Sequence, residues 1–203
     1  FGSGASVSSH APSVASLMEQ LTESFKVPNM GYTLREYTSI LEDRFGRRRL
    51  IEELRKLFSG LKPTGSLLNL PLYGWKSIYT TNYDSLIESA YRQKEIGFAL
   101  YESNRDFTVQ NKPNSVNIFK LHGSISIDIV DGYEARIILT DSDYDHTQSF
   151  REGLYDRLKS DLHGATMIII GHSLADEHIK EIANRQAELS AKSGGLGRVV
   201  LLI

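Results

Sequence analysis

The chain has 203 residues, 40% of them hydrophobic and 24% charged, which is the composition of one globular domain able to bury a core. Its 23 Lys and Arg residues against 25 Asp and Glu leave a net charge of −2, too small to argue for nucleic acid or an acidic membrane surface as a partner. The absence of cysteine excludes disulfides, thiol nucleophiles and zinc ribbons, and no apolar run reaches the ~20 residues that cross a bilayer.

Helical periodicity dominates the first third of the chain. Leu17, Leu21 and Phe25 share one face of a predicted helix, and Thr33 with Glu36 fits the capping box that begins a second helix. We expect residues 31–72 to form a helical insertion.

Short apolar runs alternate with helical segments from residue 77 onward. The predicted helices and strands are, in chain order, strand 77–81, helix 84–93, strand 116–121, helix 148–162, strand 166–170 buried on both faces, helix 177–191 and strand 199–203. The alternation of Ile125, Ile127 and Ile129, followed by Asp131-Gly132, predicts a hairpin that returns through residues 137–139. The alternation of strand and helix predicts an α/β fold, Rossmann-like, with a mostly parallel sheet and helices on both faces.

The two ends of the sequence resemble parts of a sheet. Phe1 looks like the last residue of a strand, and residues 199–203 look like a strand in the middle of a sheet. We therefore expect residues 1–203 to form a single catalytic domain that belongs to a longer chain.

Small and polar residues follow four of the expected strands, where ligands bind in open parallel sheets. The four segments are Gly2 to Ser6, Thr80 to Asp84, Lys120 to Ser124, and Gly171 to Asp176. Each alone has a simpler interpretation: a tight turn, a helix cap at Asn82 or Asp84, a core histidine at His122, and a turn with a cap. Their coincidence at successive strand ends favours a nucleotide site.

Two other features carry little functional weight. The remaining histidines, including His172, show no spacing typical of metal ligands, so no metal site is predicted. The run Arg47-Arg48-Arg49 is predicted to be a solvated helix face.

In order and spacing the four segments resemble the sirtuin superfamily, in its divergent branch found in bacterial antiphage defence proteins. The most specific parts are TTNYD at 80–84, KLHGS at 120–124, LTDSDY at 139–144 and GHSLAD at 171–176. The chain lacks the four-cysteine zinc module of the deacylases, and Thr81 stands where deacylases place a glutamine. The resemblance therefore argues against peptide deacylation.

The resemblance implies a role for ten residues around NAD. The residues implied to hold the NAD diphosphate are Gly2, Gly4, Ala5 and Ser6. Those implied around the nicotinamide ribose and carboxamide are Thr81, Asn82 and Asp84. His122 matches the catalytic histidine, and Gly171 and Ser173 match the turn beside the adenine ribose.

The expected chemistry is cleavage of the nicotinamide–ribose bond of NAD, which serves as substrate without a metal. Nicotinamide leaves as a neutral molecule, so the site needs to orient ribose and water rather than to supply an acid. His122 is expected to activate water or a ribose hydroxyl, Asn82 to orient it, and Asp84 to lie near the carboxamide or to support Asn82.

Three functions compete at this stage. The favoured one is a cytoplasmic NAD hydrolase that depletes NAD in antiphage defence by abortive infection. An ADP-ribosyl or acyl-lysine transferase and a non-catalytic nucleotide sensor are the alternatives. Because no segment resembles a sensor, we expect a homo-oligomer whose regulatory domain or subunit lies outside these residues.

Overall fold

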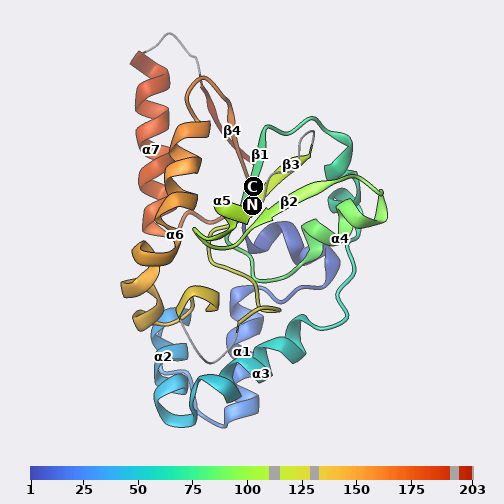
Figure 1. Cartoon of the computed structure of the whole chain (residues 1–203). Helices are drawn as coiled ribbons and strands as arrows, with labels where there is room; N and C mark the ends of the chain where they lie inside the picture. The colour runs from blue at the N-terminus through green and yellow to red at the C-terminus, as the bar shows by residue number, and fades with distance from the viewer. Residues whose placement is uncertain (110–114, 129–132, 193–196, 203) are drawn as a thin grey trace.

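A computed structural model describes residues 1–109, 115–128, 133–192 and 197–202. Within these ranges every strand pairing is parallel, and helices connect and cover the strands (Figure 1). The chain therefore has the predicted α/β, Rossmann-like fold.

The strands form two parallel sheets. Three strands have the order β1-β3-β2, with β1 at Ser77–Thr80, β2 at Phe98–Tyr101 and β3 at Val116–Lys120 in the centre. The other sheet pairs β4 at Met167–Ile170 with β5 at Val199–Leu202. The parallel order requires crossovers, which α4 (Leu86–Gln93) and α7 (Glu177–Lys192) help to supply.

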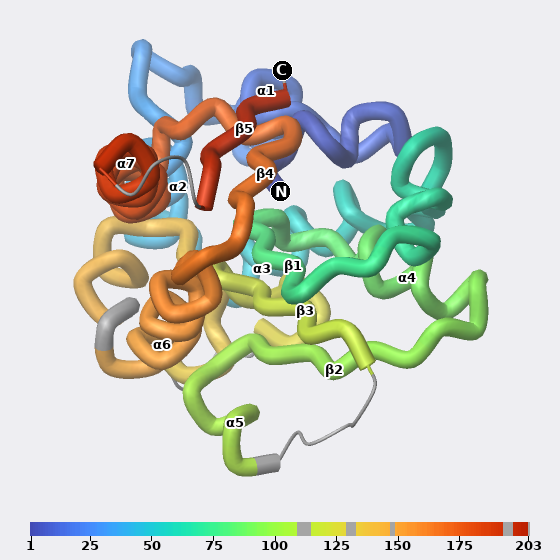
Figure 2. The backbone as a smooth tube through the Cα atoms, turned by 90° about the horizontal axis from the view of Figure 1, so that it is seen from above, coloured from blue at the N-terminus to red at the C-terminus, as the bar shows by residue number. Residues whose placement is uncertain are grey.

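The first residues of the chain lie between the two sheets. The amino group of Phe1 donates to the carbonyl of Tyr79 at 2.7 Å, and the N–H of Thr81 donates to the carbonyl of Phe1 at 3.2 Å. On the other side, the N–H of Gly2 donates to the carbonyl of Ile170 at 3.0 Å. Figure 2 shows this arrangement from above, with the N-terminus between β1 and β4.

Helices cover both faces of the three-stranded sheet, as predicted. On one face Tyr101 and Phe119 pack in a cluster with side chains of α6 (Asp141–Asp161) and α7. On the other, Ile78 and Ile118 pack with side chains of α4 and of the 3-10 helix η2 (Gly65–Leu72). This double cover fixes the ends of β1 and β3, at which two of the four polar segments begin; the segment at Gly171 follows β4, and the segment at Gly2 follows no strand among the described residues.

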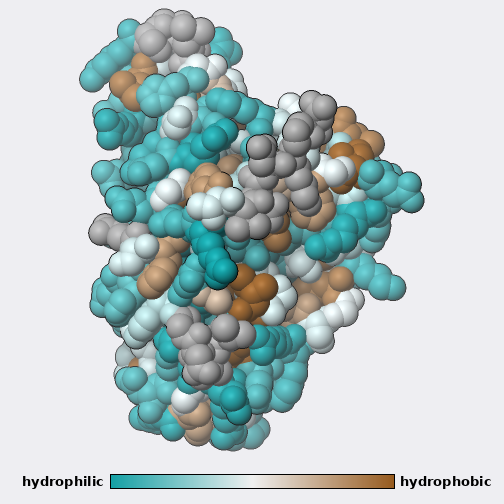
Figure 3. Space-filling view, viewed as in Figure 1, coloured by the Kyte–Doolittle hydropathy of each residue, from teal (hydrophilic) through white to brown (hydrophobic). Residues whose placement is uncertain are grey.

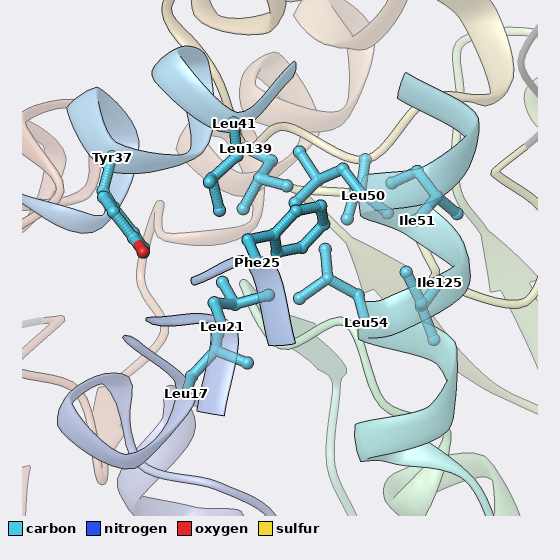
Figure 4. Packing of buried hydrophobic residues seen from close by; sticks show 11 residues of the cluster. Leu17, Leu21, Phe25, Tyr37, Leu41, Leu50, Ile51, Leu54, Ile125 and Leu139 are labelled. Carbon is cyan, nitrogen blue, oxygen red and sulfur yellow. The ribbon is translucent and has the colours of Figure 1, made fainter. Parts of the chain in front are cut away.

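A separate helical layer lies below the sheet in Figure 1. It contains α1 (Val14–Phe25), α2 (Leu34–Phe45) and α3 (Arg47–Phe58). Their apolar faces form one buried cluster, which Figure 4 shows from close by. Its side chains include Leu17, Leu21, Phe25, Tyr37, Leu41, Leu50, Ile51, Leu54, Ile125 and Leu139. The capping box at the start of α2 is present, with the N–H of Thr33 bonded to Glu36 at 2.8 Å.

The helical insertion differs from the prediction at both ends. The helix α1, which precedes it in sequence, packs with α2 and α3 in the same cluster, whereas η2, within residues 31–72, packs against the sheet. The short elements η1 (Ser3–Ser9), α5 (Asp106–Val109) and η3 (Tyr133–Ala135) complete the described structure.

The predicted hairpin is wrong in its described part. Residues 125–127 form a turn, and residues 137–139 belong to no strand; Ile129 and the turn at residues 131–132 lie outside the described residues. Ile125, Ile137 and Leu139 are instead buried against the helical layer. Of the alternating isoleucines, Ile125 packs on the helices, Ile127 is 38% exposed and Ile129 lies outside the described residues.

Arg47 is the largest departure from the expected solvated face, since only 5% of it is exposed. Its guanidinium donates to Asp143 at 2.7 Å, to Asp128 at 2.6 Å and to the carbonyl of Ile137 at 3.0 Å. Burial alone would lower the pKa of Arg47, but the contacts with these two carboxylates raise it above its ordinary value. Arg47 thus ties α3 to the segment after β3 and to the start of α6.

Three smaller predictions were also wrong. Strand β2 was not predicted, α6 begins seven residues before the predicted helix 148–162, and β4 is not buried on both faces because Ile168 is 38% exposed.

The face shown in Figure 3 is mainly hydrophilic, with apolar residues in small patches. Among the described residues, no helix is both long enough and apolar enough to cross a membrane.

Candidate active site

The four polar segments meet at one pocket that encloses about 760 Å³, part of it open to solvent. The predicted site residues that line it are Gly2, Ser6, Thr81, Asn82, Asp84, His122 and Ser173. Gly4, Ala5 and Gly171 do not line it. A second cavity of about 860 Å³ lies between β1 and β4, but neither Asn82 nor His122 lines it, so the first pocket is the candidate site.

Asn82 is held by its amide nitrogen. Nδ2 donates to the carbonyl of Gly2 at 3.1 Å and to Oγ of Ser6 at 3.0 Å, and the side chain is almost fully buried. Its backbone N–H donates to Oγ1 of Thr80, the last residue of β1. Since both amide protons are used, Oδ1 is the atom of Asn82 that can accept a hydrogen bond from a ligand.

Asp84 is occupied by protein contacts. Oδ1 accepts from the N–H of Leu86 at 3.0 Å, and Oδ2 accepts from Oγ of Ser6 at 3.0 Å. The buried ammonium of Lys120 donates to the carbonyl of Asp84 and, at 3.1 Å, to Glu88. Asp84 therefore begins helix α4 and supports Asn82 through Ser6, which corresponds to the second of the two roles considered for it.

His122 lies at the end of β3 and is 5% exposed. Its Nε2 is 2.9 Å from Oδ2 of Asp176, a residue to which the sequence analysis gave no role. The ring packs edge-on against Tyr144, with centroids 5.9 Å apart, and the guanidinium of Arg35 lies 4.4 Å from the centroid of Tyr144.

The signal that could have found Asp176 is its position in GHSLAD. It stands one residue before helix α7, where an aspartate is a preferred cap, and Oδ1 accepts from the N–H of Ile179 at 3.0 Å. The cap is visible in the sequence, whereas the contact of the other oxygen with His122 depends on the fold.

The glycine turn and the turn after β4 are packed backbone against backbone. The N–H of Gly4 donates to the carbonyl of Gly171 at 2.8 Å, and a Cβ on Gly4 would lie 2.9 Å from that oxygen. A Cβ on Gly171, whose φ is +60°, would lie 2.1 Å from the backbone nitrogen of Ala5. These contacts require glycine at both positions for packing alone, so contact with a diphosphate stays a prediction.

His172 and Ser173 line the pocket from the turn after β4. The N–H of Leu174 donates to Nδ1 of His172 at 2.9 Å, which places the proton of the neutral ring on Nε2. Burial, and next the nearby amino terminus, lower the pKa of His172. The imidazole of His172 thus lines the pocket together with the His122–Asp176 pair. No group of three or more His, Asp or Glu side chains among the described residues is arranged to hold a metal ion.

Comparison with known families places this site in a class. Residues 76–202 match the SIR2-like domain, and since this is more than half of the chain, the protein belongs to that family. The matched region contains Asn82, His122 and Asp176, whereas the glycine turn and helices α1 to α3 precede it.

Two curated relatives are similar to most of this chain. NAD(+) hydrolase ThsA of Enterococcus faecium is 26% identical over 144 residues, which are 70% of this chain and 26% of that protein. NAD(+) hydrolase ThsA of Bacillus cereus (strain MSX-D12) is 26% identical over 147 residues, 72% of this chain and 27% of that protein. The chain thus aligns with about a quarter of the length of these relatives.

Proposed function

We propose that this chain is the catalytic domain of an NAD hydrolase, which cleaves the bond between nicotinamide and ribose to give nicotinamide and ADP-ribose. The observation that carries the proposal is the convergence on one pocket of the Oδ1 atom of Asn82 and the His122–Asp176 pair. Both relatives are named for the same activity, hydrolysis of NAD.

The reaction suits these side chains. Nicotinamide leaves with the electron pair of the broken bond and becomes neutral, so no acid is needed, and the ribose passes through an oxocarbenium-like state. Water attacks the ribose carbon and gives its proton to His122, from which it passes to solvent. Asn82 accepts a hydrogen bond from water or a ribose hydroxyl through Oδ1 and so fixes the direction of attack.

The two packed turns supply the rest of the proposed NAD site. In this proposal Gly2 and Ser6 line the pocket near the diphosphate, Gly4 and Ala5 shape the turn behind them, and the turn at Gly171 and Ser173 lies by the adenine ribose. Thr81 lies beside Asn82 at the nicotinamide end, and no metal takes part.

The test measures nicotinamide and ADP-ribose after incubation of the purified chain with NAD. N82A and H122A should each lower turnover by at least ~100-fold while the melting temperature is kept. Asn184 and His163 are exposed residues outside the pocket, so N184A and H163A serve as matched controls. Near-normal turnover in both site variants would remove them from the mechanism.

Product analysis separates the alternatives. Equal amounts of nicotinamide and ADP-ribose, or its cyclic form, indicate hydrolase chemistry. Nicotinamide release only when a protein or acyl-lysine acceptor is added would indicate a transferase. NAD binding with no release under either condition would indicate a sensor and overturn the proposal.

We also propose that the NAD hydrolase activity is regulated and serves antiphage defence. An unregulated NAD hydrolase would drain the NAD of its host, so we expect control by an oligomer or by a domain or subunit outside these residues, in the cytoplasm, during antiphage abortive infection. NAD cleavage by the full-length protein should rise when extract from infected cells is added. Steady cleavage by a monomeric full-length protein, insensitive to such extract, would contradict this part.

A further inference from the structure

The two carboxylate oxygens of Asp176 have different neighbours. Oδ1 caps helix α7 by accepting from the N–H of Ile179, while Oδ2 lies 2.9 Å from Nε2 of His122. Less than a tenth of either side chain is exposed. Because the cap anchors one oxygen to the helix, the other is held at a fixed place beside the imidazole.

The surroundings keep this carboxylate charged. Burial would raise the pKa of Asp176, but the contact with His122 and the bond from Ile179 lower it to about 2. The other titratable side chains around the pair that interact with Asp176 are Tyr83, Tyr144, Tyr155, His172 and His178. The lowered pKa favours the charged form of the carboxylate beside the ring.

The other ring nitrogen of His122, Nδ1, can accept a proton. Nδ1 makes no hydrogen bond to any residue that the structure describes, and the histidine lines the pocket together with Asn82. A carboxylate 2.9 Å from Nε2 favours the neutral ring that carries its proton on that nitrogen and its lone pair on Nδ1.

We propose that Asp176 is the positioning residue of His122, an inference that rests on the proposed NAD hydrolase activity. Asp176 orients the imidazole and fixes its proton on Nε2, so that Nδ1 accepts the proton of the attacking water. When that proton arrives, His122 becomes a cation, and the adjacent carboxylate stabilises it without being protonated itself.

The variant D176N separates this role from the helix cap. Asparagine caps helices as well as aspartate does, so the fold should persist while the negative charge is lost. D176S likewise keeps a capping oxygen but is too short to hold the ring. Asp156 is 61% exposed at its side chain and pairs with Lys159 on the same helix, so D156N is the matched control for loss of one charge.

We expect D176N and D176S to lower kcat for NAD cleavage by about 10- to 100-fold, with KM changed less than about threefold. Melting temperatures and the kinetics of D156N should stay close to those of the unaltered chain. A loss of activity that tracks a loss of folded protein, or unchanged kcat in both variants, would overturn the proposal.

A second measurement does not depend on activity. In ¹⁵N spectra of histidine-labelled protein, the signals of His122 are identified as those missing from H122A. The neutral ring should carry its proton on Nε2, and this preference should weaken in D176N. A proton on Nδ1 in the unaltered chain would refute the positioning role. If the chain failed to cleave NAD but kept this signature, the proposed function would fail while the geometry of the pair would stand.

Discussion

Replacing Arg47 by methionine tests the buried ion cluster that joins the helical layer to the site. The guanidinium is buried with Asp128 and Asp143, which are 1% and 4% exposed, and its loss would remove the buried cation that both carboxylates contact. Removing one partner of a buried pair costs about 3–5 kcal/mol, a large part of the roughly 5–15 kcal/mol that stabilises a typical domain. For a chain of this size the melting temperature should fall on the order of 10 °C.

Urea unfolding of R47M at pH 7 and pH 5 measures this cost. Without the arginine, the two buried carboxylates take up protons more readily in the folded than in the unfolded chain. The loss in the free energy of unfolding should therefore be largest at pH 7 and smaller at pH 5. The double variant R47M/D128N should regain part of the stability at pH 7, because it lacks one of the two buried negative charges.

Arg48 provides the control, because it is the next residue on the same helix and is exposed. R48M should change the free energy of unfolding by less than about 0.5 kcal/mol. The reasoning about the buried cluster would be refuted if R47M lost less than about 1 kcal/mol in the free energy of unfolding. It would also be refuted if this loss were larger at pH 5 than at pH 7.

Much of the fold could be predicted because it depends on local pattern. The buried stripe of α1, the capping box of α2 and the apolar strands each arise from residues close in sequence. Strand β2, Phe98–Tyr101, was missed because it contains no β-branched residue, unlike β1 and β4 of the same length. The meeting of the four polar segments could also be predicted, since the ends of parallel strands share one edge.

What could not be predicted depends on partners far apart in the chain. Arg47 is buried because Asp128 and Asp143, 81 and 96 residues away, meet it. The same cluster explains the wrong hairpin, since the N–H of Ile137 donates to Asp128 at 2.8 Å instead of to a neighbouring strand. The alternating pattern did not show that Ile125 is buried on helices while Ile127 is exposed.

The site shows the same division. The sequence singled out Asn82 and His122 from their motifs, but not Asp176, whose contact with His122 exists only once α7 packs beside β3. It also could not distinguish the two roles of Asp84, because those depend on Ser6, 78 residues away.

Three further variants test how the site is held. G4V should lower the free energy of unfolding by about 1–3 kcal/mol, because its side chain would meet the carbonyl of the facing turn, and unchanged stability would mean that the turns are not tightly packed. K120M should cost about 3–5 kcal/mol in urea unfolding, since it removes the cation from a fully buried ion pair, and a neutral result would show that the pair is not stabilising. S6A removes the hydroxyl that accepts from Asn82, so the amide keeps only one of its two acceptors and its Oδ1 is less well aimed. We expect kcat for NAD cleavage to fall about tenfold in S6A with little change in KM, because small displacements of an orienting group are costly. The exposed residue Ser8 of the same 3-10 helix gives the control S8A, and equal kcat in S6A and S8A would show that Asn82 does not depend on this hydroxyl.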